Sequence, residues 1–316
     1  MSSALQHFPP LLPKHGQRSG RSLRRRFRNH LTAYLFILPT LAGFGIFMVL
    51  PTISAFGISA TKWNILGLPQ YVGLSNYFDL IFRDPVFWHS LWLTVLYTLY
   101  EIPIQLVIAL VLAIQLNKGM AGTGIFRTIF VMPWITTPIA VGLIWKWILD
   151  PNFGLLVKPL SWFGIHAPTI LNSLWFALPS IALVNIWRFT GYKMMLFLAG
   201  LQSIPHTVYE AAEIDGANGF KRVWYITLPL LKPATMFVVI TSLIGSFKIF
   251  DTVFIMTQGG PGDATRVYYF YLYQNAFEFF KMGYASAMAV LLFMIIMAMT
   301  LVQYWYFKSQ ITYDLT

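Results

Sequence analysis

The sequence predicts an all-α, polytopic membrane protein with six transmembrane helices. Of its 316 residues, 57% are hydrophobic and only 10% are charged, a composition too apolar for a soluble domain. A helix needs about 20 apolar residues to cross the hydrocarbon core of a bilayer. Six stretches reach this length, near residues 33–58, 90–116, 125–149, 174–200, 232–257 and 284–307.

The first 30 residues form a basic tail before the first apolar stretch. They carry seven lysines and arginines and too few apolar residues to fold alone. The stretch near 33–58 is longer than the core of a secretory signal and no small-residue cleavage pattern follows it, so we expect it to remain as an anchor. The sequence therefore predicts a basic cytosolic tail at 1–30 and a membrane domain at 31–316.

The charges near the ends of the spans predict the orientation of the chain. Thirteen lysines and arginines fall on the side of the amino terminus and five on the opposite side. Cytosolic segments of membrane proteins are enriched in these residues, so we expect both termini to lie in the cytosol. The same bias accounts for the net charge of +11, and we expect no nucleic-acid partner.

The sequence lacks the residues for chemistry of its own. It contains no cysteine, which excludes thiolate metal ligands and a cysteine nucleophile. Its six histidines are scattered without the spacing of a metal site, and no Gly-x-x-x-x-Gly-Lys-Ser/Thr phosphate loop occurs. We therefore expect a chain that is not an enzyme, binds no metal and carries no cofactor.

Polar side chains recur along one face of three expected spans. Such side chains are costly at membrane depth, and by default they face a pathway or the interior of a helix bundle. The polar stripes are Thr94, Thr98, Glu101 and Gln105 in the second span, Asn185, Arg188 and Tyr192 in the fourth, and Ser242 and Ser246 in the fifth. We expect Lys248 and Asp251, three residues apart, to form a self-neutralising structural pair.

The segment between the fourth and fifth spans, residues 201–229, predicts a bent pair of short helices on a cytosolic loop. Ser203 is placed to cap the first helix and Asp215-Gly216 to end it, because glycine accepts the left-handed conformation that ends helices. The second helix begins near Phe220. The expected apolar face of the first helix consists of Val208, Ala211, Ala212 and Ile214. From these residues alone, the pair of helices either lies on lipid or enters a groove of a partner protein.

The spacing within this loop resembles a known motif. Glu210-Ala211-Ala212 is followed after three residues by Gly216 and after nine more by Ile226, with Leu228-Pro229 close behind. This spacing closely resembles the EAA motif of permease subunits from binding-protein-dependent ABC importers. Residues 132–154, 198–205 and 257–290 are similar to the carbohydrate-uptake branch of that family, which includes the maltose and glycerol-phosphate permeases.

The resemblance implies a type I ABC importer transmembrane domain in a bacterial or archaeal cytoplasmic (inner) membrane. The implied partners are a second homologous permease subunit, a dimer of ATP-binding subunits and an external solute-binding protein. ATP and Mg would be bound by the ATPase partner and not by this chain. The residues that would couple the loop to the ATPase are Glu210, Ala211, Ala212, Asp215 and Gly216.

The substrate that the resemblance implies is a sugar, either an oligosaccharide or a glycoside. Sugar sites offer amide, hydroxyl and aromatic partners. The candidate substrate-binding residues are Tyr192, Asn185, Arg188, Ser242 and Ser246. For the two serines, a hydrogen bond to the backbone of their own helix is a competing explanation. Arg188 either binds an acidic solute or pairs with Glu101.

A second hypothesis is a stand-alone, ion-coupled carrier in which Glu101 is the proton or cation site. Six spans are few for such a carrier, and its expected inverted repeat is not evident in the sequence. Glu210→Lys or Gly216→Val would stop an ATP-driven importer and leave a carrier active. Glu101→Gln would stop the carrier.

Overall fold

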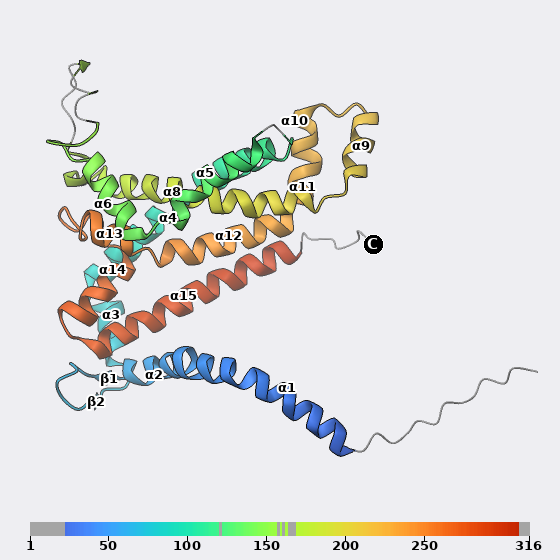
Figure 1. Ribbon diagram of the computed structural model, residues 1–316. Helices are drawn as coiled ribbons and strands as arrows, with labels where there is room; N and C mark the ends of the chain where they lie inside the picture. Colours follow the sequence, from blue (N-terminus) through green and yellow to red (C-terminus); the bar gives the residue numbers. More distant parts are fainter. Residues whose placement is uncertain (1–22, 120–121, 157–158, 160–161, 164–168, 310–316) are drawn as a thin grey trace, which may run out of the picture. The chain divides into compact units, whose positions relative to one another are not determined.

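The computed structural model describes residues 23–119, 122–156, 159, 162–163 and 169–309, and most of these residues are helical. The basic tail predicted at 1–30 lies largely outside this described part. The chain divides into two compact units, residues 1–54 and 55–316. The first unit contains α1 (Leu23–Phe44), a π-helical segment, η1 (Gly45–Val49), and the first half of α2 (Leu50–Ser59), within which the unit ends (Figure 1).

The second unit contains four long helices among its described residues, together with a broken pair and several short elements. The long helices are α4 (Pro85–Leu116), α8 (Ala177–Gln202), α12 (Lys232–Phe247) and α15 (Met282–Lys308). The broken pair is α5 (Thr123–Ile135) and α6 (Pro138–Ile148). The short helices are α3 (Ser75–Phe82), α9 (His206–Ile214), α10 (Gly219–Arg222), α11 (Leu228–Leu230), α13 (Asp251–Met256) and α14 (Tyr268–Tyr273).

The remaining elements are short connections. A 3-10 turn, η2, spans Ile170–Asn172, and two π-helical segments, η3 (Val223–Thr227) and η4 (Gln274–Glu278), continue α10 and α14. Strands β1 (Thr61–Lys62) and β2 (Gln70–Tyr71) form an antiparallel pair with Thr61 opposite Tyr71.

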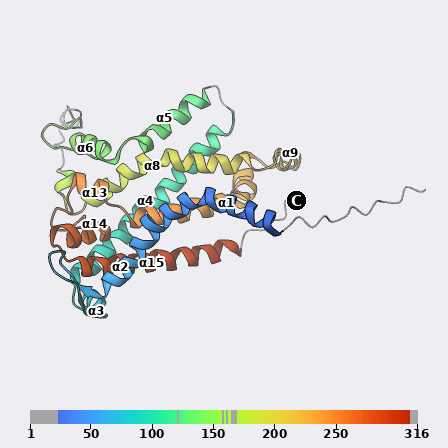
Figure 2. The ribbon, with the colours of Figure 1, turned by 60° about the horizontal axis from the view of Figure 1, so that its bottom comes forward.

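The core of the second unit lies where α4, α8 and α12 pack together, with α15 on the outer side of α12 (Figures 1 and 2). Ala109 and Ala113 of α4 belong to one buried cluster with Phe197 and Leu198 of α8. Small residues let membrane helices approach closely, and the large side chains of the partner helix fill the remaining space. This packing holds the polar faces of the three helices toward one another.

By length and composition, four helical stretches in the described part of the chain are able to cross a membrane, which is fewer than the six expected. They are Tyr34–Ser59, Pro85–Leu116, Lys232–Met256 and Met282–Lys308. The expected span at 125–149 is instead the broken pair of α5 and α6, which is bent by 94° and would make a fifth span if counted as one. Pro138 opens α6 and disfavours helical backbone at Thr137, which explains the break.

The expected fourth span is helical but more polar than the others. As α8 it runs for 26 residues, enough to cross the hydrocarbon core, but its charged and polar side chains keep it outside the group of strongly apolar helices. The predicted all-α membrane fold is therefore confirmed in its class, with four to five membrane-capable helices in the described residues.

Asp84 fixes the start of α4 and connects it to two other helices. Its Oδ1 accepts hydrogen bonds from the backbone N–H groups of Val86 (2.9 Å) and Phe87 (3.1 Å), as a helix-capping residue does. Its Oδ2 accepts from the hydroxyls of Tyr271 in α14 and Tyr284 in α15. Burial, followed by the bond to Asp84, raises the pKa of Tyr271 to about 12, so this phenol stays protonated and remains a donor.

Candidate functional site

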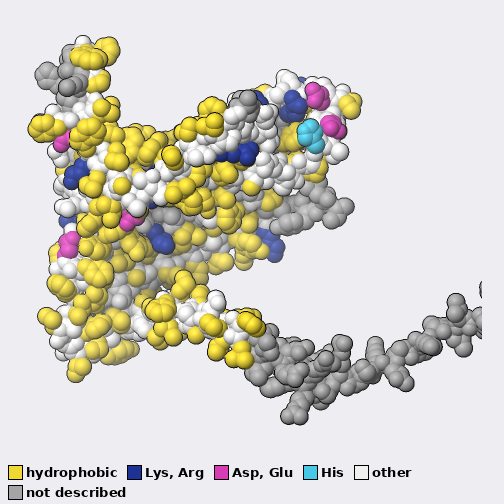
Figure 3. Space-filling model, in the orientation of Figure 1, with side chains coloured by type: hydrophobic (Ala, Val, Ile, Leu, Met, Phe, Trp, Pro, Cys, Tyr) yellow, Lys and Arg dark blue, Asp and Glu magenta, His cyan; other side chains and the backbone are white. Residues whose placement is uncertain are grey.

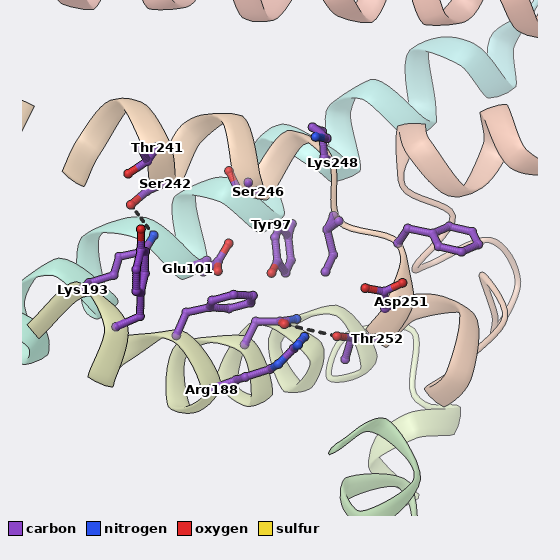
Figure 4. Close-up of a pocket in the computed structure, with 16 residues that line it drawn as sticks. Tyr97, Glu101, Arg188, Lys193, Thr241, Ser242, Ser246, Lys248, Asp251 and Thr252 are labelled. Atoms are coloured by element: carbon purple, nitrogen blue, oxygen red, sulfur yellow. Dashed lines mark hydrogen bonds between the residues drawn. The ribbon is translucent and has the colours of Figure 1, made fainter. Parts of the chain in front are cut away.

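A polar cavity of about 180 Å³ lies between α4, α8, α12 and the linker that leads to α13 (Figure 4). All five predicted substrate-binding residues line it: Asn185, Arg188 and Tyr192 from α8, and Ser242 and Ser246 from α12. Residues about 50 positions apart in the sequence thus converge on one space. Their contact with a solute stays a prediction.

Asn185 and Tyr192 differ in how much of their polar surface remains free. The Asn185 amide donates to the Ile181 carbonyl oxygen at 3.1 Å and accepts from the Thr252 hydroxyl at 3.2 Å, so both of its ends are occupied. The ring of Tyr192 stacks on Trp134 of α5, with centroids 4.6 Å apart. Its hydroxyl has no hydrogen-bond partner within the described part of the chain.

Arg188 is buried, with donors that the protein leaves largely unused. Its guanidinium lies 4.9 Å from the centroid of the Phe189 ring, and Nη2 donates to the Thr136 carbonyl oxygen across a long 3.5 Å. Its Nε has no hydrogen-bond partner among the described residues. The expected alternative, a pair between Arg188 and Glu101, is wrong, because none of the ion pairs in the described part of the chain joins these two side chains.

Ser242 and Ser246 face the cavity, but their hydroxyls already have partners. The Ser242 hydroxyl accepts from the Lys193 ammonium, and the Ser246 Oγ lies 3.0 Å from Thr98 Oγ1 of α4. Both serines also donate to carbonyl oxygens of α12 itself. The structure thus shows the backbone hydrogen bonds that were the competing explanation for these two serines.

Lys193 belongs to the site, although the sequence analysis missed it. It is 6% exposed, lines the cavity and donates to Ser242, and its charge acts on Glu101. A lysine in the middle of an apolar stretch was the available signal, because charges at membrane depth mark pathways or pairs. Lys193 follows Tyr192 directly and does not continue the stripe at helical spacing. The spacing of polar residues in α8 therefore does not include it.

The polar stripe of the second expected span is confirmed as an interior face. Thr94, Thr98, Glu101 and Gln105 of α4 are all between 0% and 8% exposed. Thr94 Oγ1 accepts from the backbone N–H of Tyr268 at 2.9 Å, and Gln105 Nε2 donates to the Asn185 carbonyl oxygen at 3.2 Å. Only Glu101 of this stripe reaches the cavity.

The expected pair of Lys248 and Asp251 is wrong. The pair required one continuous helix, but α12 ends at Phe247 and α13 begins at Asp251. Among the described residues, no ion pair joins the two side chains. Figure 4 shows Lys248 directed away from Asp251. The break in the helix removes the spacing on which the prediction relied.

The loop at 201–229 folds into short helices as predicted, but its start differs. Ser203 is the C-terminal cap residue of α8, where its hydroxyl donates to the Gly200 carbonyl oxygen at 2.7 Å. It therefore does not cap α9. Pro205 is the residue that precedes α9. Because proline fixes its own backbone angle and restricts the residue before it, α9 cannot begin as early as Ser203.

Gly216 ends α9 as predicted. It has a φ of +71°, its N–H donates to the Glu213 carbonyl oxygen at 3.1 Å, and the N–H of Ala217 donates to the Ala212 carbonyl oxygen at 2.9 Å. This pair of bonds is the Schellman motif, in which a left-handed residue closes the helix. A Cβ at Gly216 would meet nothing within 4 Å, so only the backbone conformation favours glycine here.

The expected apolar face of α9 is split in two. Ala212 is 6% exposed and points inward with Val208 one turn earlier, whereas Ile214 is 87% exposed and points outward with Ala211. The acidic and histidine side chains of the loop gather on its surface (Figure 3). Glu210 lies 3.3 Å from His206 in an exposed pair.

Glu213 faces the second helix of the loop. Its carboxylate lies 3.6 Å from the guanidinium of Arg222, beside a cavity of about 430 Å³ between α9 and the segment α10–η3. Among the residues that the structure describes, no group of three or more histidines and acidic residues is placed to hold a metal ion.

The fold and the cavity define a class of protein. It is a helical membrane protein with a polar cavity between its spans and an exposed helical loop beyond them, which is the organisation of a transport subunit. Residues 87–310 match the family described as binding-protein-dependent transport system inner membrane component, and the chain belongs to this family.

Known proteins agree with this membership. The chain is 36% identical over 293 residues to the probable ABC transporter permease protein YesP of Bacillus subtilis, covering 90% of this chain and 92% of the relative. It is 37% identical to the sulfoquinovosyl glycerol transport system permease protein SmoG of Agrobacterium fabrum, covering 75% and 77%. A solved bacterial ABC transporter involved in the import of the acidic polysaccharide alginate matches at 21% identity with a TM-score of 0.81, covering 92% of this chain and 99% of that one, which supports the fold alone.

Proposed function

We propose that this chain is the translocation subunit of an ATP-driven importer for a sugar or glycoside, and that it forms half of the transmembrane pathway. The observation that carries the proposal is the cavity, in which amide, guanidinium and aromatic side chains from α8 meet hydroxyls from α12. The family match supports an importer that depends on a binding protein. The stand-alone carrier hypothesis does not account for that membership.

In this proposal the chain spans the membrane six times. The bent pair of α5 and α6 counts as one broken span, and α8 is a span whose polar face is covered by α4 and α12. An even number of spans agrees with both termini in the cytosol, as the distribution of lysine and arginine favours. The loop at 201–229 then lies on the cytosolic side of a bacterial or archaeal inner membrane.

The partners of the proposed complex are a second permease, a dimer of ATP-binding subunits that holds ATP and Mg, and an external solute-binding protein. The surface that would dock on an ATP-binding subunit is the outward side of α9 with its end at Asp215 and Gly216. Its exposed Ala211 and Ile214 offer a small apolar contact, which suits insertion of a short helix into a groove. No catalytic step is assigned to this chain.

The solute proposed for the cavity is polyhydroxylated, a sugar or a glycoside. The relative SmoG is named for a sulfonated glycoside, and the alginate importer takes an acidic polysaccharide. The unused donors of Arg188 favour an acidic group, because guanidinium binds such groups through two parallel hydrogen bonds.

Two substitutions at Gly216 test the coupling. Valine at a φ of +71° is strained by on the order of 1 kcal/mol or more, whereas asparagine tolerates left-handed backbone. Gly216→Val is expected to abolish uptake and to lose the ATP-binding subunits on co-purification in mild detergent. Gly216→Asn is expected to retain both. Normal uptake by Gly216→Val would contradict the docking of this loop.

A further inference from the structure

Most polar side chains around the cavity already have hydrogen-bond partners within the chain. The amide of Asn185 is bonded at both ends, and the hydroxyls of Ser242 and Ser246 are bonded to Lys193 and Thr98. A solute can use these groups only by breaking existing hydrogen bonds, and replacing one hydrogen bond with another gains little free energy. The groups with unused capacity therefore matter most for recognition.

Among the α4 residues that line the cavity, Glu101 has an oxygen atom that can still accept a hydrogen bond. Its side chain is 5% exposed, it lines the cavity, and its Oε2 is a buried oxygen without a hydrogen-bond partner among the residues that the structure describes. Figure 4 shows Glu101 between the side chains of α8 and those of α12. A buried carboxylate oxygen without a partner loses its hydration without compensation. A hydrogen-bond donor that enters the cavity would compensate for that loss.

Lys193 places a positive charge near Glu101 and leaves its carboxylate able to accept a hydrogen bond. Its ammonium is held by the Ser242 hydroxyl, and its charge acts on the carboxylate, although no ion pair within 4.0 Å joins the two side chains. The lysine therefore supplies a compensating charge without occupying the carboxylate oxygens. The carboxylate retains its capacity to accept hydrogen bonds.

We propose that Glu101 binds a hydroxyl group of the transported solute through Oε2, with Lys193 as a positioning residue. This inference rests on the proposed function and adds a solute ligand on α4, opposite the candidates of α8. The group of the solute that faces Oε2 is a hydrogen-bond donor, because this oxygen is an acceptor with unused capacity. An acidic solute is therefore oriented with its hydroxyls toward α4 and its acidic group toward Arg188.

The test uses the full complex, reconstituted in lipid vesicles with its partner subunits. The probes are maltose, glycerol 3-phosphate, sulfoquinovosyl glycerol and an alginate oligosaccharide, and each probe that is transported is then supplied as analogues that lack one hydroxyl. For the unsubstituted chain, loss of one particular hydroxyl is expected to weaken transport by about 10- to 100-fold, as for a hydrogen bond to a charged group. In Glu101→Gln, the same analogue is expected to lose about tenfold less.

Thr94→Val provides the matched control. Thr94 lies two turns from Glu101 on the same helix, is fully buried and accepts from the backbone N–H of Tyr268, but does not line the cavity. It is expected to change the amount of folded complex without changing which hydroxyl is recognised.

Each outcome has a distinct meaning. If Glu101→Gln keeps the hydroxyl preference of the unsubstituted chain, the inference is overturned and the proposed function stands. If Thr94→Val loses the same preference, the effect is structural and the inference is again overturned. If the unsubstituted complex transports none of the four probes, the proposed function itself fails, and the role of Glu101 with it.

Discussion

Two glycines show how single residues are fixed by different physical demands. A Cβ at Gly191 would lie 1.8 Å from the Phe130 carbonyl oxygen, so α8 and α5 touch only because this position has no side chain. Gly216 has free space around it and is fixed by its positive φ alone. The first glycine is a packing requirement of the membrane domain, and the second is a conformational requirement of the loop.

Gly191→Ala is expected to destabilise the protein strongly, because helix α5 must move away from α8 to relieve the contact. Overpacking of this kind costs about 1–3 kcal/mol or more. The matched control is Gly124→Ala in α5, where a Cβ meets nothing within 4 Å and alanine is the better helix former by about 1 kcal/mol. Thermal unfolding in detergent should show a lower midpoint for the first variant only. Equal midpoints would contradict the packing of α5 on α8.

Among the elements, α4 is held at its start by one residue. Asp84 caps the helix and accepts from tyrosines of α14 and α15, so three helices meet at one carboxylate. The sequence showed an aspartate before a proline, which is a helix-start signal. It contained no sign of the two tyrosines, which lie nearly 200 residues away and reach Asp84 only through the tertiary fold.

Asp84→Ala is expected to lower the free energy of unfolding by about 2–4 kcal/mol, because the variant loses a helix cap and leaves two half-buried tyrosine hydroxyls without their acceptor. Asp79→Ala serves as the control, since it removes only an exposed pair with Arg83, worth about 0.3–0.5 kcal/mol. The comparison is made by denaturation of the two variants in the same detergent. A loss of similar size in both would contradict the role given to Asp84.

At the scale of the whole molecule, composition and periodicity predicted the class of fold and five of the residues that line the cavity. The five predicted substrate-binding residues line one cavity because polar stripes on separate spans have to face one another in lipid. Breaks in helices were harder to predict. The bend at Thr136-Thr137 and the gap between α12 and α13 depend on local backbone, and the second of these made the Lys248–Asp251 prediction wrong.

Hydrogen-bond saturation was the other feature that the sequence could not reveal. Whether a buried serine or glutamate can still accept a hydrogen bond depends on the atoms around it. The structure shows that Ser242 already accepts from Lys193, whereas Oε2 of Glu101 has unused capacity among the described residues. The family match shows that the chain belongs to a transport system, and the part of the cavity in that transport is our proposal.

The central claim is that the polar cavity is part of the transport pathway, and thiol labelling tests it most directly because the chain contains no cysteine. Tyr192→Cys places a thiol in the cavity wall, and Trp187→Cys places one on the outward side of the same helix, where the native side chain is 47% exposed among apolar neighbours. With thiol-blocked partner subunits, a membrane-impermeant reagent should modify Tyr192→Cys, more slowly when transported solute is present, and should leave Trp187→Cys unmodified. Failure of Tyr192→Cys to react with or without nucleotide, or equal reaction of both variants, would contradict the account.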